Sequence, residues 1–472
     1  MTDNANTLEV ISPYSGKVVM TRPYATRSQV GTSIDQATVA YKAWRRTSLA
    51  DRITLAEKLI GTFEAKRDTL APEISLQMGR PVRYAQGEVN GLLERSRYVV
   101  SIAKEQLADH TCPDKAGFVR FIRKEPLGVV LVIAPWNFPY VVAINAVLPA
   151  VLAGNVVIIK HAPQTPLCGE RLAECFAEAG FPPGVVQSCV WTHQDCDWAI
   201  EHLPINFVNF TGSVATGKVV AQAACHRLVG TGMELGGKDP AYVRSDADLP
   251  YTVEQLVDGA MFNSGQSCCS VERIYVHQSV YDEFVNQFVT LVKQYRLGDP
   301  SNPATTLGPV VNRVAAERIR QQIKDAVAMG AKVLVPEDPF RQQIQPQVLE
   351  ESAFVVPQVL VNVNHKMDIM INETFGPVVC IMSVSTDEEA IRLMNDSQYG
   401  LTASIWTQDQ TAALNLGDQI ETGTFFMNRC DYLDPELAWT GTKYSGRGCT
   451  LSPFGFDQFI RYKSFHMKLS GN

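Results

Sequence analysis

A short run of small and polar residues around two adjacent cysteines is the segment best suited to covalent chemistry. It covers residues 262–269, Phe-Asn-Ser-Gly-Gln-Ser-Cys-Cys, and follows a stretch typical of a helix. Glycine and small polar residues at such a place predict a tight, exposed turn that presents a thiol to a substrate. A single cysteine is more often a small buried hydrophobe, and we expect that role for Cys269. Cys268 is therefore the candidate nucleophile.

A lone glutamate between apolar residues marks the end of a predicted strand. Glu234 lies in residues 233–238, Met-Glu-Leu-Gly-Gly-Lys. Ligands of doubly wound sheets bind at the carboxyl ends of the strands. A partly buried carboxyl has a raised pKa, which suits a general base. The ordinary alternative is a strand-end glutamate that pairs with Lys238.

An asparagine follows another predicted strand, in residues 135–139, Pro-Trp-Asn-Phe-Pro. The side-chain amide or the backbone N–H of Asn137 would face the crevice at the strand ends. A hydrogen-bond donor placed there stabilises an oxyanion. The ordinary alternative is a helix cap, a position at which asparagine is favoured.

Residues 210–217, Phe-Thr-Gly-Ser-Val-Ala-Thr-Gly, predict a strand, a turn and the start of a helix. Backbone N–H groups at a helix N-terminus favour a phosphate group. The chain lacks the usual G-x-G-x-x-G dinucleotide fingerprint, so this segment alone is an ordinary βα turn.

The elements that must position these residues follow an alternating pattern. Residues 28–110 have apolar residues at helical spacing, and short apolar runs then alternate with amphipathic stretches. The first runs lie at 129–133, 156–159, 185–190, 205–210 and 228–233. A second α/β unit starts near Leu235, with candidate strands at 273–276, 332–335, 354–360, 378–383, 403–406 and 424–427. This alternation predicts a doubly wound α/β fold.

The uncharged stretch from Pro126 to Ile159 is long enough to span a bilayer. Its prolines and the Trp136-Asn137 pair favour instead a βαβ unit buried in a parallel sheet, and we expect no membrane contact.

Composition limits the function classes. The 472 residues are 46% apolar and 19% charged, which is typical of a globular chain of about two or three domains. The net charge of −7 and the lack of a basic face argue against a nucleic-acid partner. The eleven cysteines follow no disulfide framework and the first residues form no signal peptide, so we expect reduced thiols in the cytoplasm.

Together, the order of the four motifs and the 34-residue spacing from Glu234 to Cys268 resemble the NAD(P)-dependent, non-acylating members of the aldehyde dehydrogenase superfamily. Residues 372–377, Asn-Glu-Thr-Phe-Gly-Pro, resemble the second cofactor motif of that family. A late segment resembles its C-terminal signature, with Asn428, Trp439, Lys443 and Ser445-Gly446. The resemblance covers nearly the whole chain.

The resemblance implies three structural units. A Rossmann-like cofactor-binding domain would comprise residues 1–110 and 128–233, and an α/β catalytic domain residues 234–428. A small β oligomerisation arm would comprise residues 111–127 and 429–472. The arm implies a homodimer or homotetramer, with strands near residues 117–124 and 459–469 at the interface, because open sheet edges are usually covered.

In this family the cysteine at the position of Cys268 attacks the aldehyde carbon. The asparagine at the position of Asn137 and the backbone N–H of the cysteine hold the oxyanion. Hydride then leaves to the nicotinamide, and the glutamate at the position of Glu234 activates the water that hydrolyses the thioester. The resemblance therefore implies that Cys268, Glu234 and Asn137 are catalytic.

The resemblance also implies NAD or NADP as the cofactor, and no metal. Lys160 matches the lysine at the adenosine ribose, Ser213 the residue at the pyrophosphate, and Glu373 the residue at the nicotinamide ribose. Pro163 occupies the position at which NAD-preferring members often carry a glutamate that repels a 2′-phosphate. Either NAD or NADP could therefore be the cofactor. Residues 189–194 also lack the glycine-rich turn of many relatives. The expected cofactor-binding residues are Ile133, Pro135, Trp136, Lys160, Pro163, Gly212, Ser213, Gly217, Leu235, Glu373 and Phe375.

The resemblance also narrows the class of aldehyde that is expected as the substrate. Succinic semialdehyde dehydrogenases often place arginines where this chain has Phe262 and Asn145. An apolar or aromatic tunnel is expected instead, which favours an apolar or aromatic aldehyde over succinic semialdehyde. Core packing of the aromatic residues is an equally good explanation, and Arg429 and Asp431 are candidates for the tunnel mouth. The expected substrate residues are Phe138, Phe262, Leu433 and Trp439.

Other functions stay open at this point. A semialdehyde dehydrogenase or a CoA-acylating dehydrogenase would have the same fold, although the acylating members characteristically lack the glutamate at position 234. A cysteine hydrolase would need a histidine near Cys268, and none has an evident motif relation to it. A non-enzymatic use of the scaffold, as in some lens proteins, would not require Cys268, Glu234 and Asn137 to be intact.

Overall fold

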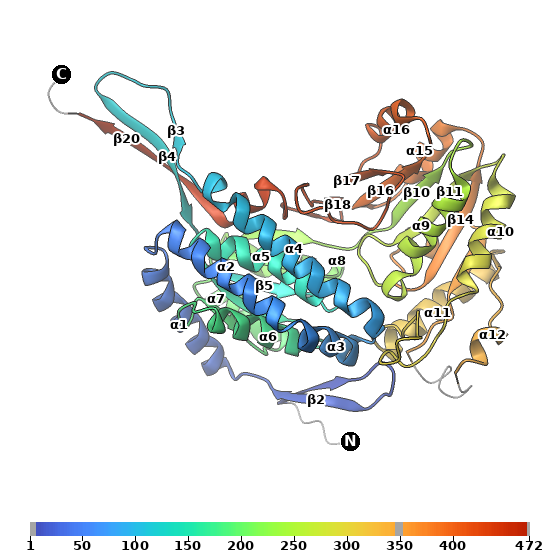
Figure 1. Ribbon diagram of the computed structural model, residues 1–472, viewed down its shortest axis with the longest axis horizontal. Helices are drawn as coiled ribbons and strands as arrows, with labels where there is room; N and C mark the ends of the chain where they lie inside the picture. The colour runs from blue at the N-terminus through green and yellow to red at the C-terminus, as the bar shows by residue number, and fades with distance from the viewer. Residues whose placement is uncertain (1–5, 345–352, 470–472) are drawn as a thin grey trace.

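The computed structural model describes residues 6–344 and 353–469, and two α/β units and an extended arm are visible in it (Figure 1). Over the described residues, no helix has both the length and the apolar character needed to cross a membrane. The expectation of an α/β fold with a Rossmann-like unit, a second α/β unit and a small β arm is confirmed.

The first unit is built on a six-stranded sheet with the order β19-β9-β8-β5-β6-β7. All neighbouring strands are parallel except β19 and β9. Every residue of β5 and β6 is buried, as expected of strands covered on both faces. The strands are β5 (Val129–Ala134), β6 (Val156–His161), β7 (Val186–Ser188), β8 (Phe207–Thr211), β9 (Gly230–Glu234) and β19 (Gly446–Arg447).

Two groups of helices accompany this sheet. The helices that connect its strands are α5 (Pro139–Leu152), α6 (Pro166–Glu178), α7 (His193–His202) and α8 (Val214–Cys225). The N-terminal helices are α1 (Arg27–Trp44), α2 (Leu49–Ala65), α3 (Arg67–Met78) and α4 (Val82–Gln106). Helix α4 packs along α5, and both lie over the same region of the sheet (Figure 1). The uncharged stretch from Pro126 to Ile159 is thus a buried βαβ unit, as predicted.

The second unit contains a seven-stranded sheet with the order β12-β13-β14-β11-β10-β16-β17. Its strands are β10 (Asp239–Val243), β11 (Val271–His277), β12 (Lys332–Val333), β13 (Gln358–Val361), β14 (Val378–Val384), β16 (Thr402–Trp406) and β17 (Thr424–Met427). Its helices are α9 (Leu249–Met261), α10 (Tyr281–Val292), α11 (Arg313–Ala328), α12 (Asp338–Arg341), α14 (Asp368–Ile371), α15 (Asp387–Asn395) and α16 (Gln410–Gly417). Strands β15 (Tyr399–Gly400) and β18 (Thr442–Lys443) form a separate small ladder.

The arm is a three-stranded antiparallel sheet that projects from the body near the C-terminus (Figure 1). Strand β4 (Phe118–Pro126) lies between β3 (His110–Thr111) and β20 (Ile460–Lys468). The rings of Phe121 and Phe465 stack across β4 and β20 with centroids 4.5 Å apart. The two strands predicted near residues 117–124 and 459–469 therefore pair with each other.

Several elements differ from the sequence prediction. A hairpin of β1 (Thr7–Ile11) and β2 (Val18–Pro23) precedes the helices. Strand β10 was not predicted, because Asp-Pro is typical of turns rather than of a central strand. Asp239 is tolerated there because it accepts hydrogen bonds from the backbone and the hydroxyl of Thr402. The predicted strand at 354–360 begins later, at Gln358.

Candidate active site

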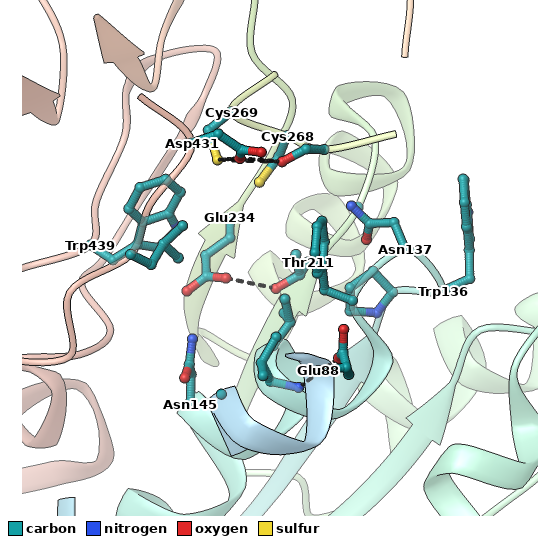
Figure 2. A pocket seen from close by; sticks show the side chains of 18 of the residues that line it. Glu88, Trp136, Asn137, Asn145, Thr211, Glu234, Cys268, Cys269, Asp431 and Trp439 are labelled. Atoms are coloured by element: carbon teal, nitrogen blue, oxygen red, sulfur yellow. Dashed lines mark hydrogen bonds between the residues drawn. The ribbon is translucent and has the colours of Figure 1, made fainter. Parts of the chain in front are cut away.

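The two α/β units meet around one cavity of about 750 Å³. Its wall contains residues predicted for the cofactor and residues predicted for the substrate, as Figure 2 shows for some of them. The predicted residues brought together there are Pro135, Trp136, Asn137, Phe138, Gly212, Ser213, Glu234, Leu235, Phe262, Cys268, Glu373, Phe375, Leu433 and Trp439. Ile133, Lys160, Pro163 and Gly217 lie outside this wall.

The turn that carries Cys268 follows the end of α9 and is strained. Asn263 and Ser264 have φ values of 52° and 57°, in the left-handed region. A Cβ on Gly265 would lie 2.0 Å from the carbonyl oxygen of Gly376, so this position requires glycine. The turn is buried against the 376 loop rather than exposed, which corrects the prediction. Only the side of the turn that carries Cys268 opens into the cavity.

The two adjacent cysteines have different surroundings. Cys269 is 2% exposed, as expected, but it is more than a core hydrophobe. Its Sγ donates to Oδ1 of Asp431 over 2.9 Å, and the Ser267 hydroxyl donates to the same oxygen over 2.9 Å. Burial raises the pKa of Asp431 to about 7. Cys268 stays half-buried at the cavity wall and is the thiol that a bound molecule reaches.

Glu234 lies at the last residue of β9, facing the cavity (Figure 2). One carboxylate oxygen accepts the Thr211 hydroxyl over 3.0 Å, and the other accepts the Thr450 hydroxyl over 2.5 Å. Burial raises the pKa of Glu234, and the two hydroxyl donors oppose that rise. Glu234 forms no ion pair with any residue in the described ranges.

Lys238, the alternative partner of Glu234, pairs elsewhere. Its ammonium group forms a buried ion pair with Glu272 and also donates to Thr374 Oγ1 over 3.1 Å. Glu272 in turn accepts the backbone N–H groups of Thr374 and Phe375. This network holds the segment with Glu373 and Phe375 against the cavity.

Asn137 is held by residues from two other segments. Its side-chain Nδ2 donates to the carbonyl of Gln266 over 3.2 Å, beside the Cys268 turn. Its own carbonyl accepts from Arg80 and from Asn263 Nδ2. The alternative of a helix cap is wrong, because α5 begins at Pro139 and its N-cap is Phe138.

A buried glutamate performs the capping instead. Glu88 accepts the backbone N–H groups of Tyr140 and Val141 at 2.9 and 3.1 Å. Its other oxygen pairs with Arg80 over 2.6 Å. Because Arg80 also donates to the carbonyl of Asn137, this pair fixes the start of α5 and the Asn137 loop together.

Seven of the eleven predicted cofactor residues line the cavity. Ser213 is the N-cap of α8 and accepts from the backbone of Thr216, so it lies at a helix N-terminus suited to phosphate. A Cβ on Gly217 would lie 2.6 Å from Leu235, so the helix packs closely on that side. Trp136 and Phe375 meet edge-to-face at 5.6 Å.

Lys160 is the penultimate residue of β6, beside Ile133 in the strand register. It is 2% exposed, and its one hydrogen bond is to the carbonyl of His161 at 3.4 Å. No carboxylate of residues 6–344 or 353–469 pairs with it, and burial lowers its pKa. A buried ammonium group without a counter-charge fits an anionic or polyhydroxy ligand. Pro163 lies nearby in a small recess with His161 and Trp191.

Glu373 completes the cofactor side. Its carboxylate accepts the backbone N–H of Gly237 over 3.0 Å. Burial, with nearby Glu272 adding to the effect, raises its pKa to about 7. The residues present therefore fit a dinucleotide, because they offer a cation, a helix N-terminus and a carboxylate. Within the described part of the chain, no cluster of three histidine, cysteine or acidic side chains is arranged to hold a metal ion.

The substrate side of the cavity is mainly aromatic. Phe262 packs edge-to-face on Tyr84 at 5.5 Å and stacks on Phe138 at 6.4 Å. Trp439 is 4% exposed and packs in a cluster with Cys269, so it serves the core and the cavity wall together. Of the two candidates for the tunnel mouth, Asp431 lines the cavity wall, whereas Arg429 does not and stacks on Tyr432, which does.

Sequence reasoning missed several residues of this site. Thr450 lies 216 residues after Glu234 and sits in no recognisable motif. Arg80, Glu88 and Arg95 are charged residues within or beside helices, where solvated side chains are the usual expectation. One signal in the sequence could have indicated two of them. Glu88 and Arg95 fall at helical spacing on the same face of α4 as its buried apolar residues, where a charged side chain interrupts the amphipathic pattern.

Comparisons with known proteins agree with this geometry. The model of the aldehyde dehydrogenase family matches residues 1–465. An aldehyde dehydrogenase of Paenarthrobacter nicotinovorans is 33% identical over 97% of this chain and 99% of its own length. The NADP(+) succinate-semialdehyde dehydrogenase 1 of Mycobacterium bovis is 32% identical over the same shares of the two chains.

Solved structures of aldehyde dehydrogenases superpose on nearly the whole chain. An NAD-dependent aldehyde dehydrogenase from Sinorhizobium meliloti superposes with a TM-score of 0.94 at 30% identity, over 100% of this chain and 93% of that one. A betaine aldehyde dehydrogenase from Staphylococcus aureus, solved with NAD+, gives 0.93 at 28% identity over the same shares. The chain belongs to the aldehyde dehydrogenase family and is an NAD(P)-dependent oxidoreductase that acts on aldehydes.

Proposed function

We propose that this chain oxidises its aldehyde to a carboxylic acid through a covalent intermediate on Cys268, with Asn137 holding the oxyanion and Glu234 acting as the base. The observation that carries the proposal is the cavity that contains both the half-buried Cys268 thiol and the half-buried Glu234 carboxyl, which has no ion-pair partner among the described residues. A nucleophile and a base of raised pKa are the two groups that thioester chemistry requires.

The first step forms a carbon–sulfur bond between Cys268 Sγ and the aldehyde carbon. The carbonyl electron pair moves to the oxygen, which becomes an oxyanion. Asn137 Nδ2 has one proton on the Gln266 carbonyl, and its second proton is available for this oxygen. The backbone N–H of Cys268 donates to no described residue and supplies a second donor. The Arg80–Glu88 pair keeps the Asn137 loop in place.

The second half of the reaction removes the acyl group. Bound NAD(P) supplies the hydride acceptor, so that loss of hydride from the thiohemiacetal carbon leaves a thioester on Cys268. Glu234 then takes a proton from water as the water oxygen bonds to the acyl carbon. The carbon–sulfur bond breaks, the carboxylic acid leaves, and the Cys268 thiolate is restored.

Lys160, Ser213 and Glu373 would hold the adenosine ribose, the pyrophosphate and the nicotinamide ribose of the cofactor. The support is the buried Lys160, which has no ion-pair partner among the described residues, the N-terminus of α8 at Ser213, and the half-buried Glu373 carboxylate. Pro163 places no negative charge near Lys160, so the proposal admits NADP as well as NAD.

The aromatic wall of Phe138, Phe262 and Trp439 favours an aldehyde with an apolar or aromatic body over succinic semialdehyde. A semialdehyde substrate is the second candidate, because several relatives are named succinate-semialdehyde dehydrogenases. CoA-dependent acylation is disfavoured, because Glu234 is present to activate water.

The arm would pair with the arm of a second copy, giving a homodimer or homotetramer. The edge of β20 carries eight residues of exposed or half-exposed strand after Ile460, and open edges of this length are usually covered. All eleven cysteines are free, which fits a reducing compartment such as the cytoplasm. The division into domains at residues 110, 128, 234 and 428 stays a prediction.

Replacing the nucleophile tests the proposal. Cys268→Ala should abolish formation of NAD(P)H from an aldehyde, while NAD(P) still binds to the folded variant. The matched control is Cys269→Ala, which removes the neighbouring thiol and should keep hydride transfer. Aldehyde-dependent NAD(P)H formation above background in Cys268→Ala would contradict the mechanism.

A further inference from the structure

A buried guanidinium group that forms no ion pair with any described residue lies in the wall of the cavity. Arg95 projects from the middle of α4 and is 9% exposed. Its Nη1 donates to the carbonyl of Val141 over 3.1 Å. With the amide of Asn145 in the orientation that satisfies both of its ends, the same nitrogen donates to the Asn145 oxygen over 3.2 Å. Asn145 lies at the cavity wall below Glu234 (Figure 2).

The nearby carboxylates are committed to other groups. Glu88 pairs with Arg80 and caps α5, and Glu234 accepts two threonine hydroxyls. Glu94 also lines the cavity, but its side chain is exposed to solvent and forms no hydrogen bond with Arg95. No ion pair joins Arg95 to any acidic residue in 6–344 or 353–469.

The protein therefore carries a buried charge that has no ion-pair partner in the described ranges, and Glu88 and Glu234 act on it only from a distance. Burial lowers the pKa of Arg95, but a guanidinium group stays protonated in proteins. Such a charge is costly unless a counter-ion or strong acceptor binds it. Both contacts of Arg95 are to neutral oxygens and involve Nη1 alone. Its Nε and Nη2 have no partner among the described residues.

The rest of the substrate side is apolar. Phe138, Val142, Phe262, Leu433 and Trp439 supply ring and aliphatic surface, and they offer no second cation. The other arginines of the wall are Arg80, which is paired with Glu88, and Arg318, which is exposed and donates to the carbonyls of Glu373 and Thr374. A buried cation without an ion pair in an apolar wall selects a ligand with an apolar body and one anionic group. The planar guanidinium fork matches the two oxygens of a carboxylate.

We propose that Arg95, oriented by Asn145 and the Val141 carbonyl, binds a carboxylate carried by the aldehyde substrate at the end away from its reacting carbon. This inference rests on the proposed function, because it assumes that the aldehyde carbon is at Cys268. The substrate class is then an oxo acid, in which an apolar chain or ring separates an aldehyde from a carboxylate.

Matched substrate pairs test the inference. Each ω-oxo acid of a chain-length series is compared with the n-alkanal of the same length, and 4-formylbenzoate is compared with 4-formylbenzamide. The quantity measured is the ratio of kcat/KM for the acid to kcat/KM for its neutral partner. In the unaltered protein this ratio should be about 10 to 100 for at least one pair, the range expected of a hydrogen-bonded charge pair.

The variant Arg95→Met keeps the length and apolar stem of the side chain and removes the charge. It should lower the acid-to-neutral ratio by about 10- to 100-fold for that pair. Arg95→Lys keeps a charge without the planar fork and should lower the ratio less. If Arg95→Met does not fold, the ratio measured with Arg95→Lys tests the inference. The matched control is Arg97→Met, because Arg97 is on the exposed face of α4 and pairs with Glu64. The control should leave the ratio unchanged.

Two results would overturn the inference. One is an unaltered protein that gives no acid advantage for any pair, and the other is an advantage that survives both Arg95 substitutions. Either result can occur with hydride transfer fully dependent on Cys268, so it leaves the proposed reaction standing. Conversely, hydride transfer by the Cys268→Ala variant would remove the reaction on which the inference rests.

Discussion

The Thr450 hydroxyl should set the pH at which Glu234 works as a base. It donates to one Glu234 oxygen over 2.5 Å, while Thr211 donates to the other over 3.0 Å. Both bonds stabilise the ionised carboxylate against the burial that raises its pKa. Thr450→Val removes one donor with little change of shape. A hydrogen bond to a charged group contributes about 1.5–3 kcal/mol, and one pKa unit corresponds to about 1.4 kcal/mol. The pKa of Glu234 should therefore rise by about one to two units.

The direction of the kinetic effect follows from the role of the base. Glu234 accepts a proton only when it is ionised, so hydrolysis of the thioester falls as the pH drops through its pKa. In Thr450→Val the acidic limb of the pH profile should move upward by about one to two units, with the plateau at higher pH kept.

The assay follows the rate of thioester hydrolysis against pH, after rapid acylation in stopped flow. The control is Thr440→Val, because the Thr440 hydroxyl donates to the carbonyl of Gly448 in the same segment and not to Glu234. An acidic limb that stays in place, or that moves to lower pH, would refute the reasoning about Glu234.

Two further predictions concern the base and the cofactor. Glu234→Gln should slow thioester hydrolysis by about 100- to 10,000-fold, the range for loss of a general base, and leave a burst of about one NAD(P)H per site in stopped-flow absorbance. Equal slowing of acylation and hydrolysis would give Glu234 another role. Lys160→Met should weaken NAD(P) binding by about 10- to 100-fold, because the buried ammonium forms no ion pair with any described residue. Calorimetric titration with NAD+ and NADP+ measures this, and unchanged dissociation constants would remove Lys160 from the cofactor site.

The sequence predicted those site residues whose position depends on the local backbone, at the ends of strands and helices. Cys268, Glu234 and Asn137 each follow a strand or a helix at a turn, so the order of elements alone places them at one edge of two sheets. The glycine at 265 and the serine at 213 also have local reasons, a left-handed turn and a helix N-cap. Such features depend on neighbours in the chain and can be predicted from it.

The residues that tune the site depend on contacts between distant segments. Thr450 reaches Glu234 across 216 residues, and Glu272 reaches Thr374 across 102. In the sequence, Arg95 resembles the other charged residues of a solvated helix. In the structure, α5 packs on α4 and its Val141 carbonyl accepts a hydrogen bond from Arg95. No pattern in one sequence states which buried charge lacks a partner, because that depends on every packed element around it.

The most direct test of the central claim is the mass of the protein during turnover. Glu234→Gln is mixed with aldehyde and NAD(P), quenched in acid during the burst, and digested for mass spectrometry. The account predicts one acyl group, with the mass of the substrate acid minus water, on the peptide that contains Cys268, and none when Cys268→Ala is added. An acyl group on Cys269 or on another residue, or a burst of NAD(P)H with no acyl group on the protein, would contradict it.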